Sequence, residues 1–138
     1  MAPPDPPQIA ALLELATFDT PDGEIRILEY AKVPWRPARD FFITRVGPEV
    51  VRGQHAHRRC WQLFRGLAGA CAIRVWTPDG REFRYTVHAG SAALLVPPRR
   101  WVEVRMASPE AVLHCLCSRP YEADDYVHDR AEFDRMDP

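Results

Sequence analysis

The sequence has almost no net charge and very little lysine. Its 138 residues carry 18 Lys and Arg against 19 Asp and Glu, a formal net charge of −1, and Lys32 is the single lysine. A chain so balanced has no general attraction for nucleic acid or for an anionic membrane surface. It also has no apolar run long enough to cross a bilayer. We therefore expect neither nucleic acid nor a membrane among its partners.

The cysteines form no CxxC pair. Cys115 and Cys117 are two residues apart, so on a strand they would share a face, which is a poor arrangement for a mutual disulfide. We expect all four cysteines to be reduced thiols of a cytoplasmic protein. The proline-rich start, MAPPDPPQ, lacks the basic and apolar regions of a signal peptide. We expect residues 1–11 to form a flexible N-terminal segment and residues 12–138 to form one domain.

Helical periodicity is nearly absent, and short apolar runs alternate with turn sequences. Thr77-Pro78-Asp79-Gly80, for example, separates two strand-like runs and indicates a hairpin. Only the tail, roughly Ala123–Arg135, has a helical composition. Eight or more short strands at near-regular spacing predict an all-β sandwich or barrel with a short C-terminal helix. The runs are 12–17, 24–31, 41–46, 50–57, 60–64, 70–76, 81–87, 92–96, 101–106 and 112–117.

Two histidines stand two residues apart in one of these strands. Side chains alternate along a strand, so the rings of His55 and His57 should point to the same face. With Gln62 and Gly69 following, the segment resembles the first motif of the cupin superfamily, in which HxH precedes a glutamate and a glycine. A second cupin motif runs from Gly90 to Pro97 and places Val102 where the third histidine is expected.

These departures from the cupin pattern argue against a metal site. Valine cannot bind a metal, and the neutral amide of Gln62 is a poor ligand for a transition metal. Glu103 is one residue out of phase with Val102 and should face away. Two histidines alone fall short of the three protein ligands of a catalytic zinc or iron site. We therefore expect no metal cofactor, and we expect the two imidazoles to act as an acid–base pair.

Arg52 is the third candidate in this strand, and its position leaves two interpretations open. It lies five residues before His57, so an ideal strand would place the two side chains on opposite faces. Arg52 is then a surface charge. A β-bulge at Gly53 would instead turn Arg52 toward the histidines.

Three segments in the right order resemble one known family. They are RGQHAH at 52–57, VPPRRW at 96–101 and YEADDYVHDRAEF at 121–133. The chain resembles the nucleotide-sugar 3,4-ketoisomerases, which are WxcM-like and FdtA-like cupins that act on dTDP-4-keto-6-deoxyglucose. The resemblance implies a cupin jelly-roll barrel, a homodimer with exchanged N-terminal strands, and no required cofactor.

The resemblance also implies the chemistry and its residues. The ketone moves from C4 to C3 through an enediol or enediolate. His57 would be the base at carbon and His55 would handle the oxygen protons, and the resemblance also allows the reverse assignment. Arg52 would stabilise the oxyanion or bind the diphosphate. Further candidates for substrate binding, among which Trp101 is equally suited to core packing, are Gln62, Phe42, Arg100 and Trp101.

Two positions differ from the family pattern. Phe41 and Phe42 stand where members commonly have tyrosines, and Val102 replaces a histidine often found after the tryptophan. His128, within the terminal signature, is expected in a structural or dimer contact. These differences keep a 3,5-epimerase of the same substrate and a non-catalytic sugar-nucleotide-binding cupin as alternatives. A metal-dependent oxygenase is the least favoured one.

Overall fold

The computed structural model describes residues 10–90 and 92–138. Most of the expected flexible segment, residues 1–11, therefore lies outside the described residues, although the first strand already begins at Ala11. No helix in the described part of the chain has the length and apolar character that a membrane span requires.

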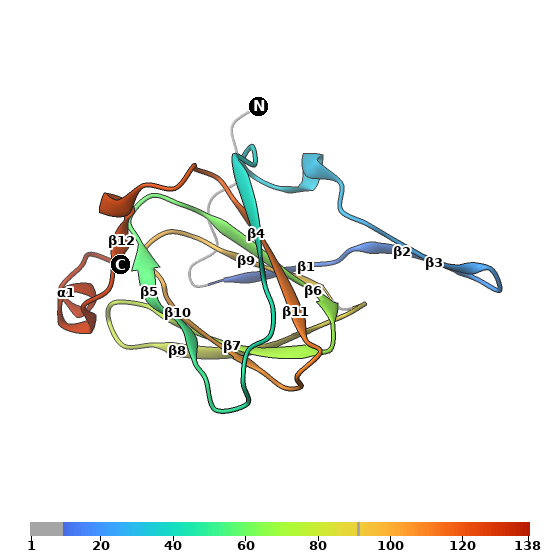
Figure 1. Cartoon of the computed structure of the whole chain (residues 1–138). Coiled ribbons are helices and arrows are strands. Elements are labelled where there is room, and N and C mark those ends of the chain that lie inside the picture. Colours follow the sequence, from blue (N-terminus) through green and yellow to red (C-terminus); the bar gives the residue numbers. More distant parts are fainter. Residues whose placement is uncertain (1–9, 91) are drawn as a thin grey trace.

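Two antiparallel sheets of five strands each form the body of the molecule (Figure 1). The first sheet has the order β1-β9-β6-β11-β4, and the second has the order β12-β5-β10-β7-β8. This arrangement confirms the predicted all-β jelly-roll barrel. The strands of the first sheet are β1 (Ala11–Leu13), β9 (Ala93–Val96), β6 (Gln62–Ala68), β11 (Val112–Cys117) and β4 (Arg39–Ile43). Those of the second are β12 (Tyr126–Val127), β5 (Arg52–His57), β10 (Trp101–Met106), β7 (Ala70–Trp76) and β8 (Glu82–His88).

The core lies between the two sheets because alternate side chains of each strand point inward. Val102, Val104 and Met106 of β10 show this period of two, and all three belong to the main buried cluster. They meet inward side chains of the opposite sheet, such as Leu94 and Leu113.

A separate hairpin projects from the barrel (Figure 1). It consists of β2 (Ala16–Thr20) and β3 (Gly23–Ile27), and Phe18 pairs with Ile25 across it. These two apolar side chains are 59% and 62% exposed. A short 3-10 turn, η1 (Tyr30–Lys32), follows before the chain enters β4. An isolated two-stranded hairpin is at best marginally stable in water.

The C-terminal segment is less helical than its composition predicts. The expected helix over Ala123–Arg135 is replaced by a 3-10 turn, η2 (Ala123–Asp125), then β12, and only then the helix α1 (Arg130–Asp134). Tertiary pairing overrides local propensity here, because Tyr126 and Val127 pair with His57 and Ala56 of β5. The segment is anchored by the fully buried ring of Phe133. It therefore brings Asp125 and Tyr126 to the strand that carries the histidines.

Candidate active site

A β-bulge shapes the strand that carries the two histidines. In the pairing of β5 with β10, Val102 faces His55 and Glu103 faces Gly53, so one residue, Gln54, is extra. Gly53 has φ +83° and Gln54 has φ +57°. A Cβ on Gly53 would lie 2.6 Å from the carbonyl oxygen of Val102, so this close approach requires glycine. The bulge lies between Arg52 and His57 and reverses the alternation of side chains at this point. As a result, Arg52 and His55 border the same cavity.

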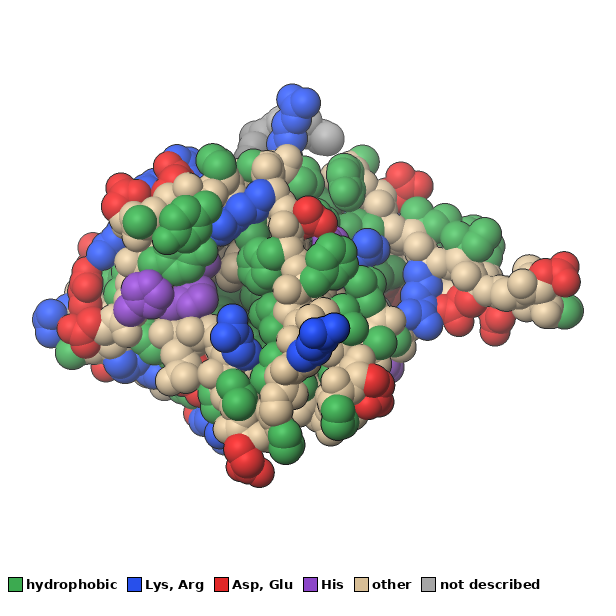
Figure 2. All heavy atoms as spheres, viewed as in Figure 1, with side chains coloured by type: hydrophobic (Ala, Val, Ile, Leu, Met, Phe, Trp, Pro, Cys, Tyr) green, Lys and Arg blue, Asp and Glu red, His purple; other side chains and the backbone are tan. Residues whose placement is uncertain are grey.

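This cavity has a volume of about 630 Å³. Figure 2 shows a hollow in one face of the molecule, with histidine side chains on one side of it and basic side chains near its rim. Among the described residues that line it, three are arginines (Arg39, Arg45 and Arg52) and none is an aspartate or glutamate. A cavity of this size suits a small-molecule ligand, and its charge suits an anionic one.

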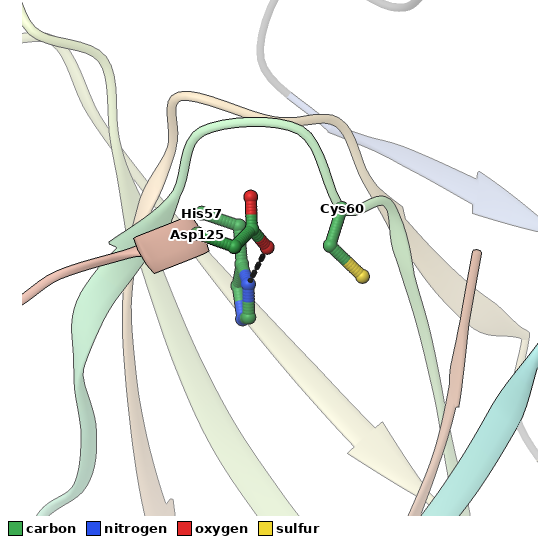
Figure 3. Close-up of side chains that lie close together, drawn as sticks. All are labelled: His57, Cys60 and Asp125. Carbon is green, nitrogen blue, oxygen red and sulfur yellow. Dashed lines mark hydrogen bonds and ion pairs between the residues drawn. The ribbon is translucent and has the colours of Figure 1, made fainter. Parts of the chain in front are cut away.

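His57 is held by a carboxylate from the C-terminal segment (Figure 3). Its Nδ1 donates to Oδ2 of Asp125 at 2.7 Å, and both side chains are buried. Burial opposes ionisation of Asp125, but hydrogen bonds from His57 and from the Arg59 backbone N–H outweigh it and lower the pKa of the carboxyl group. Burial also lowers the pKa of His57, against the opposing effect of Asp125. His57 is therefore neutral at pH 7, with its proton on Nδ1.

The Nε2 atom of His57 is then a free lone pair. It is buried and has no hydrogen-bond partner among the described residues. A buried acceptor without a partner lowers the free energy of unfolding, and such groups are typical of functional sites. Nothing in the fold of the strand itself requires it.

His55 has the same tautomer for a different reason. Its Nδ1 lies 2.9 Å from the carbonyl oxygen of Gly53, which can only accept, so Nδ1 donates. Burial, with the neighbouring His57, lowers the pKa of His55 to about 4. The two rings meet edge to face with centroids 5.2 Å apart. Both imidazoles are therefore neutral at pH 7 and present Nε2 as an acceptor.

Tyr126 is a part of the site that the sequence analysis did not identify. Its ring packs against His57 and His55, with centroid separations of 4.5 and 5.0 Å. Arg39 of β4 donates from Nη2 to the phenol oxygen at 3.2 Å, and both residues line the cavity. His128 stacks nearly parallel to the ring of Tyr126, with centroids 5.5 Å apart and an interplanar angle of 8°, and its ring also lies 5.7 Å from that of His55. His128, expected in a structural or dimer contact, thus belongs to the histidine cluster.

The sequence contains Asp125 and Tyr126 in a recognisable segment, but it does not indicate their roles. Asp125 and Tyr126 belong to the segment 121–133 that supports the family resemblance, yet they lie 68 and 69 residues beyond His57 in the sequence. Spacing along the chain cannot place them beside His57. Their approach depends on the pairing of β12 with β5, which has no local sequence pattern.

The predicted substrate-binding residues are divided between the cavity and its surroundings. Gln62 is buried and lines the cavity. Phe42 borders it, while its ring packs against His114 with centroids 4.9 Å apart. Since Phe41 and Ile43 pack on the core, alternation turns the Phe42 side chain to the outer face of β4.

Arg100 and Trp101 lie away from the cavity. Arg100 borders a separate surface pocket that is also lined by Trp61 and three prolines. Trp101 is buried against Phe133, with centroids 5.6 Å apart, and its indole N–H donates to Glu103 at 3.2 Å. Trp101 and Glu103 are two residues apart and share the face opposite Val102, so the alternation that turns Glu103 away from the cavity also turns Trp101 away.

One group of side chains has the composition of a metal site. Ligand atoms of His57, Cys60 and Asp125 lie within 4.8 Å of one another (Figure 3). The nearest atoms of His57 and Asp125 are already joined by their hydrogen bond, and the Cys60 thiol donates to the carbonyl oxygen of Trp61 at 3.2 Å. A hydrogen bond with Cys117 and burial raise the pKa of Cys60, so its thiol is protonated. An ion would have to break these contacts, and the expectation that no metal is required stays a prediction.

Together, the two five-stranded sheets and the contacting imidazoles of His55 and His57 beside the cavity define a jelly-roll barrel of the cupin class. The family model described as FdtA (WxcM-like, C-terminal) matches residues 8–137. The chain belongs to this family, which confirms the resemblance carried by the three sequence segments.

Known relatives cover most of the chain. A TDP-4-oxo-6-deoxy-α-D-glucose-3,4-oxoisomerase from Aneurinibacillus thermoaerophilus is 29% identical over 117 residues, covering 84% of this chain and 83% of the relative. The crystal structure of QdtA, a sugar 3,4-ketoisomerase from Thermoanaerobacterium thermosaccharolyticum in complex with TDP, is 26% identical with a TM-score of 0.85, and 91% of each chain is covered. A dTDP-4-dehydrorhamnose 3,5-epimerase from Bacillus anthracis, 20% identical over 85% of this chain and 76% of its own with a TM-score of 0.76, shares the fold alone.

Proposed function

We propose that this protein is a 3,4-ketoisomerase that moves the ketone of a dTDP-linked 4-keto-6-deoxyhexose from C4 to C3. The observation that carries the proposal is the pair of neutral imidazoles, each with Nε2 as an acceptor. His55 lines the basic cavity, and the ring of His57, which is not among the lining residues, lies beside it with centroids 5.2 Å apart. The family membership and the activities of the named relatives support the same reaction class. The enzyme is thus an isomerase that works by proton transfer.

The charge of the cavity supports a nucleotide diphosphate as the anionic part of the substrate. Arg45 and Arg52 line the cavity together with Arg39, and arginine binds phosphate oxygens through paired N–H donors. Arg52, next to the bulge, is our candidate for the diphosphate or for the oxyanion. Gln62 is the candidate for a hydroxyl of the sugar, and Phe42 forms the edge of the opening. Arg100 and Trp101 are not part of this proposal, because they do not line the cavity.

The reaction moves one proton from C3 to C4 and a second proton from O3 to O4. The C4 carbonyl acidifies the proton on C3, and a base removes it to form an enediolate. The same base returns a proton to C4, while the O3 hydroxyl loses its proton and O4 gains one. We assign the carbon steps to His57 because Asp125 orients its ring and supports the imidazolium that forms. His55, which lines the cavity, is the acceptor for the proton on O3.

We further propose a homodimer in which the β2–β3 hairpin packs on a second copy. The pair Phe18 and Ile25 is exposed on this hairpin, and every residue of β2 is exposed. Burial of these side chains against a second subunit removes apolar surface from water. The four free cysteines fit a reducing compartment, which supports a cytoplasmic enzyme.

Incubation of the purified protein with dTDP-4-keto-6-deoxyglucose, followed by NMR of the sugar carbons, tests the function. We expect the ketone at C3, and we expect the His57→Asn variant to form no product. A ketone that stays at C4 with inverted neighbouring carbons would identify a 3,5-epimerase, the second candidate. Binding of dTDP without any change in the sugar would identify a non-catalytic protein.

A further inference from the structure

We propose that the phenol of Tyr126 is the proton donor to the O4 oxygen of the substrate, and that Arg39 positions this phenol. The inference rests on the proposed ketoisomerase function and assigns a step that the histidine pair leaves open. That step is the delivery of a proton to O4, without which the C4 carbonyl cannot become a hydroxyl.

Neither histidine has a proton to give at the start of the reaction. Each holds its only N–H on Nδ1, and each Nδ1 donates within the protein, to the Asp125 carboxylate or to the Gly53 carbonyl. The atoms left for the substrate are the two Nε2 lone pairs, which accept protons. A cavity with two bases and a carbonyl to protonate needs an acid from another residue.

The described lining residues offer two hydroxyl groups, those of Thr44 and Tyr126. A phenol is a much stronger acid than an aliphatic alcohol, so it is the more suitable proton donor for this step. Tyr126 also lies against both imidazole rings. It is therefore the lining residue whose hydroxyl combines acidity with contact to the histidine pair.

Arg39 adds the charge that such a donor requires. Its Nη2 donates to the phenol oxygen at 3.2 Å, and a guanidinium at this distance stabilises the phenolate left behind. The Arg39 side chain also lies over the ring of Tyr121, 5.7 Å from its centroid. The titratable and charged groups facing Tyr126 are Arg39 from β4, His55 and His57 from β5, and Tyr121 and His128 from its own segment.

The protons balance over one turnover. His57 takes the C3 proton while Tyr126 gives its hydroxyl proton to O4, so the C4 carbonyl becomes a hydroxyl of the enediol. His55 then takes the O3 proton as the C3 carbonyl forms, and His57 delivers its proton to C4. Transfer from His55 to the Tyr126 phenolate, across rings 5.0 Å apart, restores the enzyme. The substrate loses protons at C3 and O3 and gains them at C4 and O4.

If Tyr126 has this role, its removal should make the enediolate return to the substrate more often and go on to the 3-keto product less often. Without a donor, negative charge stays on O4, so protonation returns to C3 and regenerates the substrate. Only a proton moved from O3 to O4 allows the ketone to appear at C3. The Tyr126→Phe variant should therefore exchange the C3 proton with solvent more often per conversion than the wild type does.

The experiment follows both rates by NMR in D2O, using dTDP-4-keto-6-deoxyglucose. We expect Tyr126→Phe to lower conversion by about 10²-fold or more and to raise the ratio of C3 exchange to conversion. The matched control is Tyr121→Phe, the same substitution on an exposed ring beside Arg39, which should keep the wild-type ratio. Equal losses of exchange and conversion, or no loss, would overturn the inference.

A fluorinated tyrosine at position 126 gives a second test that preserves the packing. Its phenol is more acidic, so the alkaline limb of the kcat profile should move to lower pH. A limb that does not move would also overturn the proposal. If the wild type converts no substrate at all, it is the proposed function that fails, and the two failures are therefore distinguishable.

Discussion

Asp125 Oδ2 accepts a hydrogen bond of 2.7 Å from His57 Nδ1, across 68 residues of sequence. This contact is possible because the C-terminal segment returns to the barrel and pairs with β5. It fixes which nitrogen of His57 carries the proton and leaves Nε2 as the acceptor. The reactivity of the HxH segment is thus set by the last twenty residues of the chain.

Removal of the Asp125 charge tests this coupling. In Asp125→Asn, the amide can present its NH2 to His57, which favours the wrong tautomer, and it no longer supports the imidazolium. We expect kcat to fall by roughly 10²-fold or more. Asp124→Asn is the matched control, because that neighbouring carboxylate is 80% exposed and pairs only at the surface with Arg59. Similar activities for the two variants would contradict the assigned role of Asp125.

The bulge at Gly53 can be tested by adding a single methyl group. In Gly53→Ala, the new Cβ would lie 2.6 Å from the Val102 carbonyl oxygen in a backbone with φ +83°. We expect a loss of about 1–3 kcal/mol in the free energy of unfolding and a weaker affinity for dTDP, because Arg52 shifts. Gly80→Ala has a similar φ of +92° but open space around the Cβ, so it isolates the cost of the dihedral angle. Equal effects in both variants would show that the close approach to Val102 is unimportant.

The histidine pair predicts an acid limb in the pH profile. A protonated imidazole cannot accept a proton, so kcat/KM should fall as pH decreases from about 6.5 toward the value of about 4 for His55. The pKa of His57 is also below its ordinary value, so the limb lies below pH 6.5. The unfolded chain binds protons at these histidines already near pH 6.5, so the free energy of unfolding should decrease over the same interval. A limb centred above pH 7 would contradict the burial effect.

Phe133 anchors the segment that supplies Asp125 and Tyr126. The ring is fully buried and packs against Trp101, so Phe133→Ala should lower the free energy of unfolding by about 3–5 kcal/mol. Denaturant unfolding measures this loss, and activity should fall with it. Phe83→Ala removes the same atoms from a ring that is 42% exposed, and it should cost about 1 kcal/mol or less.

The sequence predicted the parts of the fold that depend on local pattern. Alternation placed His55 and His57 on one face, because a strand has a period of two. The odd spacing of Arg52 left a surface charge and a bulge at Gly53 both open, and the structure has the bulge. The same alternation puts Trp101 on the face of Glu103, two residues further on, to which its indole N–H donates. Strand alternation alone therefore predicts that Trp101 faces away from the cavity.

The tail shows what local pattern cannot predict. The charged composition of residues 123–135 favours a helix, yet Tyr126 and Val127 form a strand because β5 offers unpaired backbone groups. Asp125, Tyr126 and Arg39 enter the site through pairings between distant segments. The missing tyrosines at Phe41 and Phe42 therefore did not mean that the cavity lacks a phenol.

The most direct test of the account follows dTDP-4-keto-6-deoxyglucose in D2O with the wild-type protein and with His57→Asn. We expect the wild type to yield a 3-keto sugar with deuterium at C4, because the base that delivers this proton exchanges with solvent. His57→Asn should yield neither the product nor deuterium at C3. Unchanged, unlabelled substrate with the wild type, or a labelled sugar whose ketone remains at C4, would contradict the assignment of this protein as a 3,4-ketoisomerase.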